Sequence, residues 1–213
     1  MSVQIGRKAP NLKVTKWVQG TNTNLDKQND NIVLVEVFQV NCPGCFMYGI
    51  PESIEIYDKY KSEGVSVLGM ATAFEDFDKN TLENLQLLLE TGEVIGETKK
   101  MLQADKISYK IPYPVAMDSL IKQSGEVTKE KMDSLIKNQI PNFDAQPEDY
   151  KNQIYDRVKD YFMSKEFSAE TFEMYSLQGT PSSMLIDRNG ILRDVSFGQN
   201  GLLESKIQKL LNE

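Results

Sequence analysis

The strongest hydrophobic pattern lies near the start of the chain. Residues 31–40, NIVLVEVFQV, form an almost unbroken run of β-branched and aromatic side chains, which is typical of a central strand buried on both faces. Asn41 ends the run, and Pro43 then supplies a backbone angle suited to the first turn of a helix. Helical spacing of apolar residues continues up to Gly64, and residues 65–73 form a second apolar run. This order of strand, helix and strand predicts a right-handed crossover within a parallel sheet.

Four further elements follow from the same pattern. Leucines at helical spacing predict a second helix that begins at Thr81. Residues 111–118 contain two prolines and are predicted to form an edge or peripheral strand. Residues 182–197 predict a β-hairpin with an Asn-Gly dipeptide at its turn, and residues 202–211 predict a terminal amphipathic helix.

Between these elements, residues 119–175 are polar and helix-prone, with breaks at Pro141 and Pro147. We interpret this segment as a helical insertion. Its aromatic content exceeds what a solvated linker needs, so a packed subdomain is expected. Three roles stay open for it: covering the groove beside the cysteines and selecting a partner, forming a homodimer surface, or enlarging the core.

Composition and charge exclude several classes of partner and of active site. The chain of 213 residues has a formal net charge of −7 and no basic run, which argues against a nucleic-acid partner. Histidine is absent, so Cys-His activation and most zinc or copper sites are excluded, and no metal or cofactor is expected. The sequence has neither a membrane-spanning apolar run nor an apolar secretory leader. We therefore expect a cytoplasmic protein, or alternatively an exported one whose leader has been removed.

The only cysteines, Cys42 and Cys45, stand three residues apart at the predicted start of a helix, with Pro43 and Gly44 between them as the active-site loop. Free backbone N–H groups and the helix dipole favour a thiolate at Cys42, which is the expected nucleophile. Cys45, one turn further, is placed to resolve a mixed disulfide. The alternatives are half of a metal site or two inert core thiols.

Glu36 interrupts the buried run six residues before Cys42. A carboxyl group inside such a strand is desolvated, which raises its pKa above the ordinary value of about 4.3. It could then accept the proton of Cys45 during disulfide exchange. The alternative is an outward-facing glutamate at a locally exposed point of the strand.

Residues 33–45, VLVEVFQVNCPGC, resemble the strand and active site of thioredoxins, including an acidic residue at the same distance before the first cysteine. Residues 177–191, LQGTPSSMLIDRNGI, resemble the TlpA-like segment that carries a cis-proline opposite the cysteines. This resemblance implies that Pro181 is the cis-proline and that the backbone of Thr180 pairs with a bound substrate peptide. The similarity covers most of residues 3–118 and 176–213.

The resemblance implies an α/β thioredoxin-like fold, in which a central mixed sheet is flanked by helices. We expect a single domain over residues 1–213, with an N-terminal extension and the helical insertion over 119–175. The sequence departs from the family at Asn41, where an aromatic residue usually precedes the first cysteine. It departs again at Pro43 and Gly44, which reverse the Gly-Pro of thioredoxin, so the redox potential cannot be carried over.

These features predict a thiol–disulfide oxidoreductase that acts through Cys42 and Cys45 on protein dithiols and disulfides together with a redox partner. We expect a reductase, with the direction of electron flow left open by the reversed dipeptide. One alternative is a peroxiredoxin-like peroxidase, although Val35 and Gln39 stand where that motif has proline and Thr or Ser. The other is a non-enzymatic adaptor in which a buried, inert disulfide is a structural clip.

Overall fold

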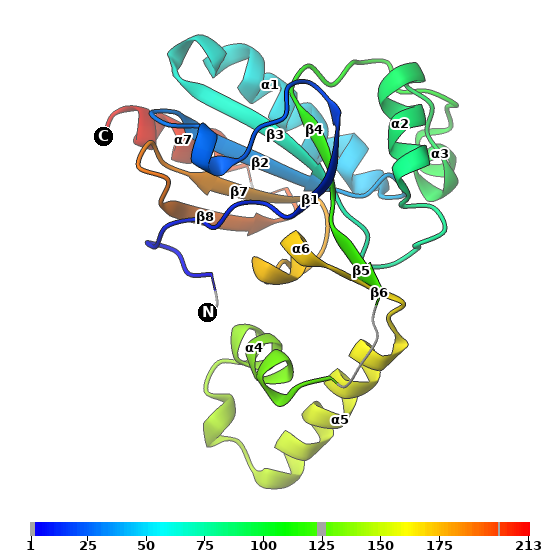
Figure 1. Cartoon of the computed structure of the whole chain (residues 1–213), viewed down its shortest axis with the longest axis vertical. Coiled ribbons are helices and arrows are strands. Elements are labelled where there is room, and N and C mark those ends of the chain that lie inside the picture. Colours follow the sequence, from blue (N-terminus) through cyan, green and yellow to red (C-terminus); the bar gives the residue numbers. More distant parts are fainter. Residues whose placement is uncertain (1–2, 123–126, 200) are drawn as a thin grey trace.

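A mixed sheet of six strands forms the centre of the computed structural model, which describes residues 3–122, 127–199 and 201–213 (Figure 1). The strand order is β1-β4-β3-β2-β7-β8, and β5 and β6 pair separately. β2 runs parallel to β3, and β3 to β4, whereas the other pairs are antiparallel, which confirms the predicted mixed sheet. The strands are β1 (Val14–Gln19), β2 (Ile32–Phe38), β3 (Val65–Ala71), β4 (Val115–Asp118), β5 (Leu120–Lys122), β6 (Phe167–Ala169), β7 (Ser182–Ile186) and β8 (Leu192–Phe197).

Two helix boundaries coincide with capping residues that the sequence supplies. The Thr81 hydroxyl accepts the backbone N–H of Asn84 at 3.2 Å and caps α2, and Gly64 takes a left-handed conformation after α1 and a short 3-10 turn. The α-helices are α1 (Ile50–Tyr60), α2 (Leu82–Thr91), α3 (Gly96–Leu102), α4 (Lys129–Gln139), α5 (Glu148–Ser164), α6 (Glu170–Met174) and α7 (Leu203–Leu211). Single 3-10 turns cover Leu25–Lys27, Lys61–Glu63 and Phe143–Ala145, and a π-helical turn covers Cys45–Gly49.

β2 lies inside the sheet, and all of its residues are buried. Its alternate side chains serve two separate cores, with Leu34 and Phe38 in one and Val35 in the other. Residues of α1, α2 and α7 fill the first core, whereas α6 and the N-terminal segment fill the second. Each buried aliphatic or aromatic side chain contributes about 1.5–3 kcal/mol, so β2 is held from both faces.

β4 corrects one prediction. We expected residues 111–118 to form an edge or peripheral strand, but β4 lies between β1 and β3 and all of its residues are buried. Pro112 and Pro114 precede the strand, so neither removes a hydrogen bond from its ladder. β1 then pairs with the outer side of β4 and becomes the edge itself.

Residues 119–175 hold the predicted helices, and Figure 1 shows α4 and α5 standing apart from the sheet. The segment also contains an antiparallel ribbon that we did not predict, in which Leu120 pairs with Ala169 and Lys122 with Phe167. Strands of this length carry too few residues to show an alternating pattern. The ribbon makes the segment leave and rejoin the fold at the same place.

Asp118 anchors this junction. Its side chain is fully buried at the end of β4 and accepts the Thr72 hydroxyl at 2.8 Å. It also accepts the backbone N–H groups of Thr171 at 2.8 Å and Phe172 at 3.1 Å, in the first turn of α6. A side chain distant in sequence therefore caps the helix that follows the ribbon.

Replacing Asp118 with alanine should lower the free energy of unfolding by at least about 2 kcal/mol, because buried N–H groups left without a partner cost about 1–3 kcal/mol each. Urea unfolding of the whole chain measures the change. Asp160→Ala, at an exposed position of α5, is the matched control and should change the stability by less than about 0.5 kcal/mol. Equal stability of the two variants would show that Asp118 does not hold the junction.

Candidate active site

The disulfide between Cys42 and Cys45 lies where the chain passes from β2 into the helical region that ends in α1. Cys45 is fully buried, whereas Cys42 is partly exposed. The backbone N–H of Cys45 points at Cys42 Sγ from 3.3 Å, and would stabilise a thiolate there once the disulfide is reduced. The partly exposed cysteine, Cys42, is therefore the one expected to be the nucleophile.

A π-helical turn follows the cysteines, from Cys45 to Gly49. Its bond from the N–H of Ile50 to the carbonyl of Cys45 spans five residues. Pro51 explains the widened turn, because it has no N–H for the carbonyl of Met47 and its ring would collide with that carbonyl in a regular α-helix. The sequence analysis missed this turn, although Pro51 was a usable signal.

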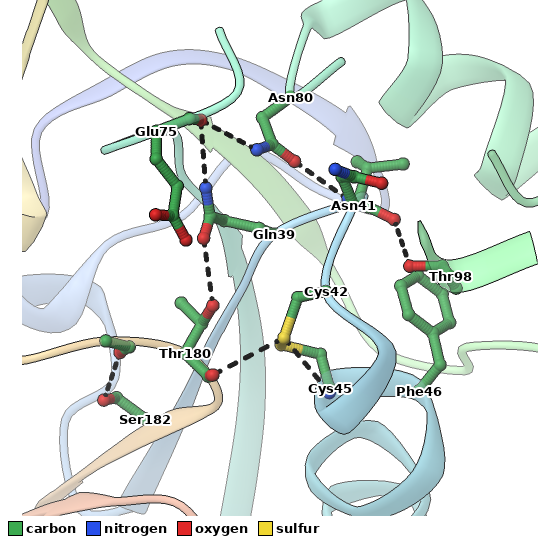
Figure 2. The surroundings of a disulfide bond; sticks show 12 residues. Gln39, Asn41, Cys42, Cys45, Phe46, Glu75, Asn80, Thr98, Thr180 and Ser182 are labelled. Atoms are coloured by element: carbon green, nitrogen blue, oxygen red, sulfur yellow. Dashed lines mark hydrogen bonds between the residues drawn. A yellow bond between two sulfur atoms is a disulfide. The ribbon is translucent and has the colours of Figure 1, made fainter. Parts of the chain in front are cut away.

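The loop before β7 faces the disulfide, as Figure 2 shows. The Thr180–Pro181 peptide bond is cis, the isomer that the resemblance implied. The carbonyl oxygen of Thr180 lies 3.4 Å from Cys42 Sγ. On the Gly44 side, a Cβ placed on that glycine would sit 3.6 Å from Pro181 Cδ, so the active-site loop and the proline are in close contact. The structure thus brings the predicted cysteines, loop and proline together.

Gln39, which is buried after the end of β2, links this loop to another segment (Figure 2). Its amide nitrogen donates to the carbonyl of Glu75 at 3.2 Å. Its amide oxygen accepts the hydroxyl of Thr180 at 3.1 Å. Gln39 therefore helps to fix the residue that contacts Cys42, a role that the sequence did not reveal.

Asn41 has a structural reason for replacing the usual aromatic residue. Its side-chain oxygen accepts the backbone N–H of Glu97 at 2.7 Å, in the first turn of α3. Its side-chain nitrogen donates to Asp76 at 2.7 Å, and its backbone N–H donates to Asn80 at 2.9 Å. The residue before Cys42 thus ties the loop that precedes α2 to α3, which an aromatic side chain could not do.

Glu36 is buried, with 2% of its surface exposed, so the alternative of an exposed glutamate is wrong. Its carboxyl group lies against Gly49 and Pro181. Burial raises the pKa of Glu36 well above its ordinary value of 4.5, and the nearby charge of Glu52 raises it further. In the part of the chain that the structure describes, Oε1 of Glu36 has no hydrogen-bond partner. A role in proton transfer stays a prediction.

The described ranges contain no cluster of three or more His, Cys, Asp or Glu residues that could hold a metal ion. None of their helices has both the length and the apolar character to cross a membrane.

Solved structures define the class of fold. A thioredoxin-like superfamily protein is 25% identical to this chain, with a TM-score of 0.61 and coverage of 97% of each chain. A thiol-disulfide isomerase from Corynebacterium glutamicum is 24% identical, with a TM-score of 0.61 and coverage of 98% of this chain and 97% of that one. A proposed thiol:disulfide interchange protein DsbE from Chlorobium tepidum is 18% identical, with a TM-score of 0.53 and coverage of 99% of each. No protein-family model and no curated protein matches the sequence.

The chain has a thioredoxin-like fold, which it shares with these solved structures. It carries a Cys-X-X-Cys pair, Cys42 and Cys45, at the start of a helix.

Gly49 provides the room in which the Glu36 carboxyl sits. A Cβ at this position would overlap Oε1 of Glu36 and would lie 2.6 Å from Pro181 Cβ. We expect Gly49→Ala to lower the free energy of unfolding by about 1–3 kcal/mol, because the buried neighbours must move. Chemical denaturation of the oxidised protein measures the loss.

Gly44→Ala is the matched control for this substitution. Gly44 has helical backbone angles, and its added Cβ would make only an ordinary contact with Pro181. Its stability should stay the same or rise by up to about 1 kcal/mol, because alanine favours helical backbone. Tolerance of alanine at both positions would refute a tight fit of Glu36 against Gly49.

Proposed function

We propose that this protein reduces disulfides of protein substrates by thiol–disulfide exchange through Cys42 and Cys45. The observation that carries the proposal is the partly exposed Cys42 sulfur, which receives the N–H of Cys45 and faces the carbonyl of Thr180 in the cis-proline loop. This places one accessible sulfur beside backbone that a substrate can reach.

The reaction starts from the reduced protein, in which Cys42 and Cys45 are both thiols. The Cys42 thiolate attacks one sulfur of the substrate disulfide, forming a mixed disulfide and releasing the other substrate sulfur as a thiolate. Cys45 then loses its proton and attacks Cys42 Sγ, which breaks the mixed disulfide and releases the second substrate thiolate. Two electrons pass to the substrate, and a redox partner must return two electrons to the Cys42–Cys45 disulfide.

Thr180 and Pro181 would form the docking site. Neither the N–H nor the carbonyl of Thr180 makes a backbone hydrogen bond within the described residues. An extended substrate segment could therefore pair with this backbone while its cysteine meets Cys42. Gln39 holds the Thr180 side chain away from that position.

Glu36 would accept the proton of Cys45. Its carboxyl lies against Pro181 and Gly49, and Gly49 is four residues after Cys45 in the same helical turn. Burial raises the pKa of Glu36, so this pKa is closer to that of a thiol than the pKa of an exposed glutamate would be. A smaller difference in pKa favours proton transfer near neutral pH.

The two alternatives have less support. An adaptor with a structural clip predicts two buried sulfurs, but Cys42 is partly exposed. A peroxidase of this kind would need proline and Thr or Ser where this chain has Val35 and Gln39. The side chain of Gln39 is already hydrogen-bonded to Glu75 and Thr180. A homodimer through residues 119–175 and a cytoplasmic location stay predictions.

Single cysteine variants test the proposed roles with insulin as the disulfide substrate. Reduced Cys45→Ser should accumulate a mixed disulfide through Cys42, because the resolving thiol is missing, whereas Cys42→Ser should trap at least about tenfold less. Non-reducing electrophoresis and mass spectrometry of the trapped adduct measure this difference. Equal trapping by both variants would contradict the assignment of Cys42 as nucleophile.

The direction of electron flow is tested in glutathione buffers by following the thiol state of the wild-type pair. A reduction potential of about −270 mV or lower is expected if the pair acts as a reductant. A value near about −120 mV would make the protein an oxidant and would overturn the reductase assignment.

Glu36→Gln should slow resolution of the mixed disulfide by about 100-fold or more, because glutamine cannot accept the Cys45 proton. In the wild type, this rate should rise with pH as Glu36 ionises, and the variant should lose that part of the profile. Stopped-flow measurement between about pH 6 and 9 follows the step. An unchanged rate over that range would remove Glu36 from the mechanism.

Stability gives an independent control on the same substitution. The pKa of Glu36 is raised in the folded state, so between its ordinary value of 4.5 and the raised value the folded protein binds the extra proton. The wild type should therefore lose unfolding free energy relative to Glu36→Gln as pH rises through this window. The difference in unfolding free energy between the wild type and the exposed-site variant Glu55→Gln should stay constant over this window.

A further inference from the structure

A small cavity lies between Glu36 and the exposed residues Gly198 and Gln199. It has a volume of about 10 Å³, and its lining includes Glu36, Gly49, Glu52, Pro181, Ser182 and Gly198. This volume is about what one water molecule needs, and a buried water is stable when it finds two to four polar partners. The two carboxyl groups and nearby backbone supply such partners.

The cavity lies beside Glu36, which needs a route for its proton in the proposed mechanism. Its carboxyl is covered by Gly49 and Pro181, and Oε1 has no hydrogen-bond partner among the described residues. A buried carboxyl that takes up a proton in every catalytic cycle must also release it, and packed apolar side chains offer no route. The cavity lies next to the one group of the proposed mechanism that needs such a route.

Glu52 lines the same cavity from the first turn of α1, three residues after Gly49. Residues three apart on a helix lie on the same side, so Gly49 leaves space for Glu36 while Glu52 approaches from the surface. Glu52 is partly buried, whereas Glu55 of the same helix is exposed and is not part of the lining.

The surrounding charges favour proton transfer between these groups. Partial burial raises the pKa of Glu52, and the negative charges of Glu55 and of Glu204 on α7 raise it further. Glu204 is itself paired with Lys59 and Tyr60. Glu36 faces Glu52 on α1 and the neutral phenol of Tyr113, whose hydroxyl is engaged with Ser53 at 2.7 Å. Burial raises the pKa more at Glu36 than at Glu52, so Glu52 ionises first and its carboxylate is available to accept the proton of Glu36.

We propose that Glu52 is a proton relay that acts through Glu36: a proton leaves the Glu36 carboxyl, crosses one water in this cavity to the Glu52 carboxylate, and passes to bulk water. No electrons move in this step, and the reverse order loads Glu36. The inference rests on the proposed function, because only disulfide exchange gives Glu36 a proton to discard. Glu52 is not a catalytic residue, since it contacts no reacting sulfur.

The test measures proton exchange at Glu36 without any substrate. A rapid pH jump on the oxidised protein, followed by time-resolved infrared spectroscopy, reports the carboxyl band of Glu36, which Glu36→Gln identifies by its loss. Glu52→Gln should slow the appearance of this band at least about tenfold, because it removes an acid–base group from the path. Glu52→Asp should restore part of the rate, because it keeps the carboxyl group.

Glu55→Gln is the matched control, because it removes an equal charge from the same helix outside the cavity. A wild-type rate in Glu52→Gln, or equal slowing in Glu55→Gln, would overturn the relay. A Glu36 band that does not respond to pH would overturn both the relay and the proton role of Glu36. Disulfide exchange is measured separately with insulin, so intact exchange with unaltered proton kinetics would reject the relay and leave the proposed function standing.

Discussion

The structure depends on keeping one carboxyl group inside the central strand of the sheet. Burial of Glu36 is costly, and its neighbours are shaped around it. Gly49 has no side chain because one would overlap the carboxyl, and Pro181 closes the other side. The π-helical turn from Cys45 to Gly49 sets which residue of the helix meets Glu36. The helix, the cis-proline loop and the strand are thus fitted to one polar group.

The end of β2 also coordinates the segments around the disulfide. Gln39 holds the Glu75 backbone and Thr180, while Asn41 holds Asp76, Asn80 and the first turn of α3. Figure 2 shows the contacts of Gln39 with Glu75 and Thr180, and that of Asn41 with Asn80, on the stretch of chain that leads to Cys42. Because both side chains are buried, movement of either loop requires buried hydrogen bonds to break. The disulfide is therefore presented by a rigid frame.

Local patterns predicted much of this arrangement. The continuous apolar run of β2, the leucine spacing of α2 and the Asn-Gly turn of the final hairpin each carry their own signal, and the Cys-X-X-Cys spacing identified the two residues that form the disulfide. Pro181 needed the family resemblance, because a proline alone favours trans. Features that depend on distant partners were missed. β4 is an interior strand because β1 pairs with it. Asn41 has its role because its side chain binds the first turn of α3. Gly49 must leave space because the Glu36 carboxyl lies against it.

The β5–β6 ribbon has a consequence for how the chain can be shortened. Leu120 and Ala169 are paired neighbours, so the stretch between them departs from and returns to one point of the structure. Removing that stretch would leave two chain ends that a few residues could rejoin, with the strand order of the sheet unchanged. The segment between the two strands of the ribbon thus has the geometry of an insertion whose two ends lie side by side.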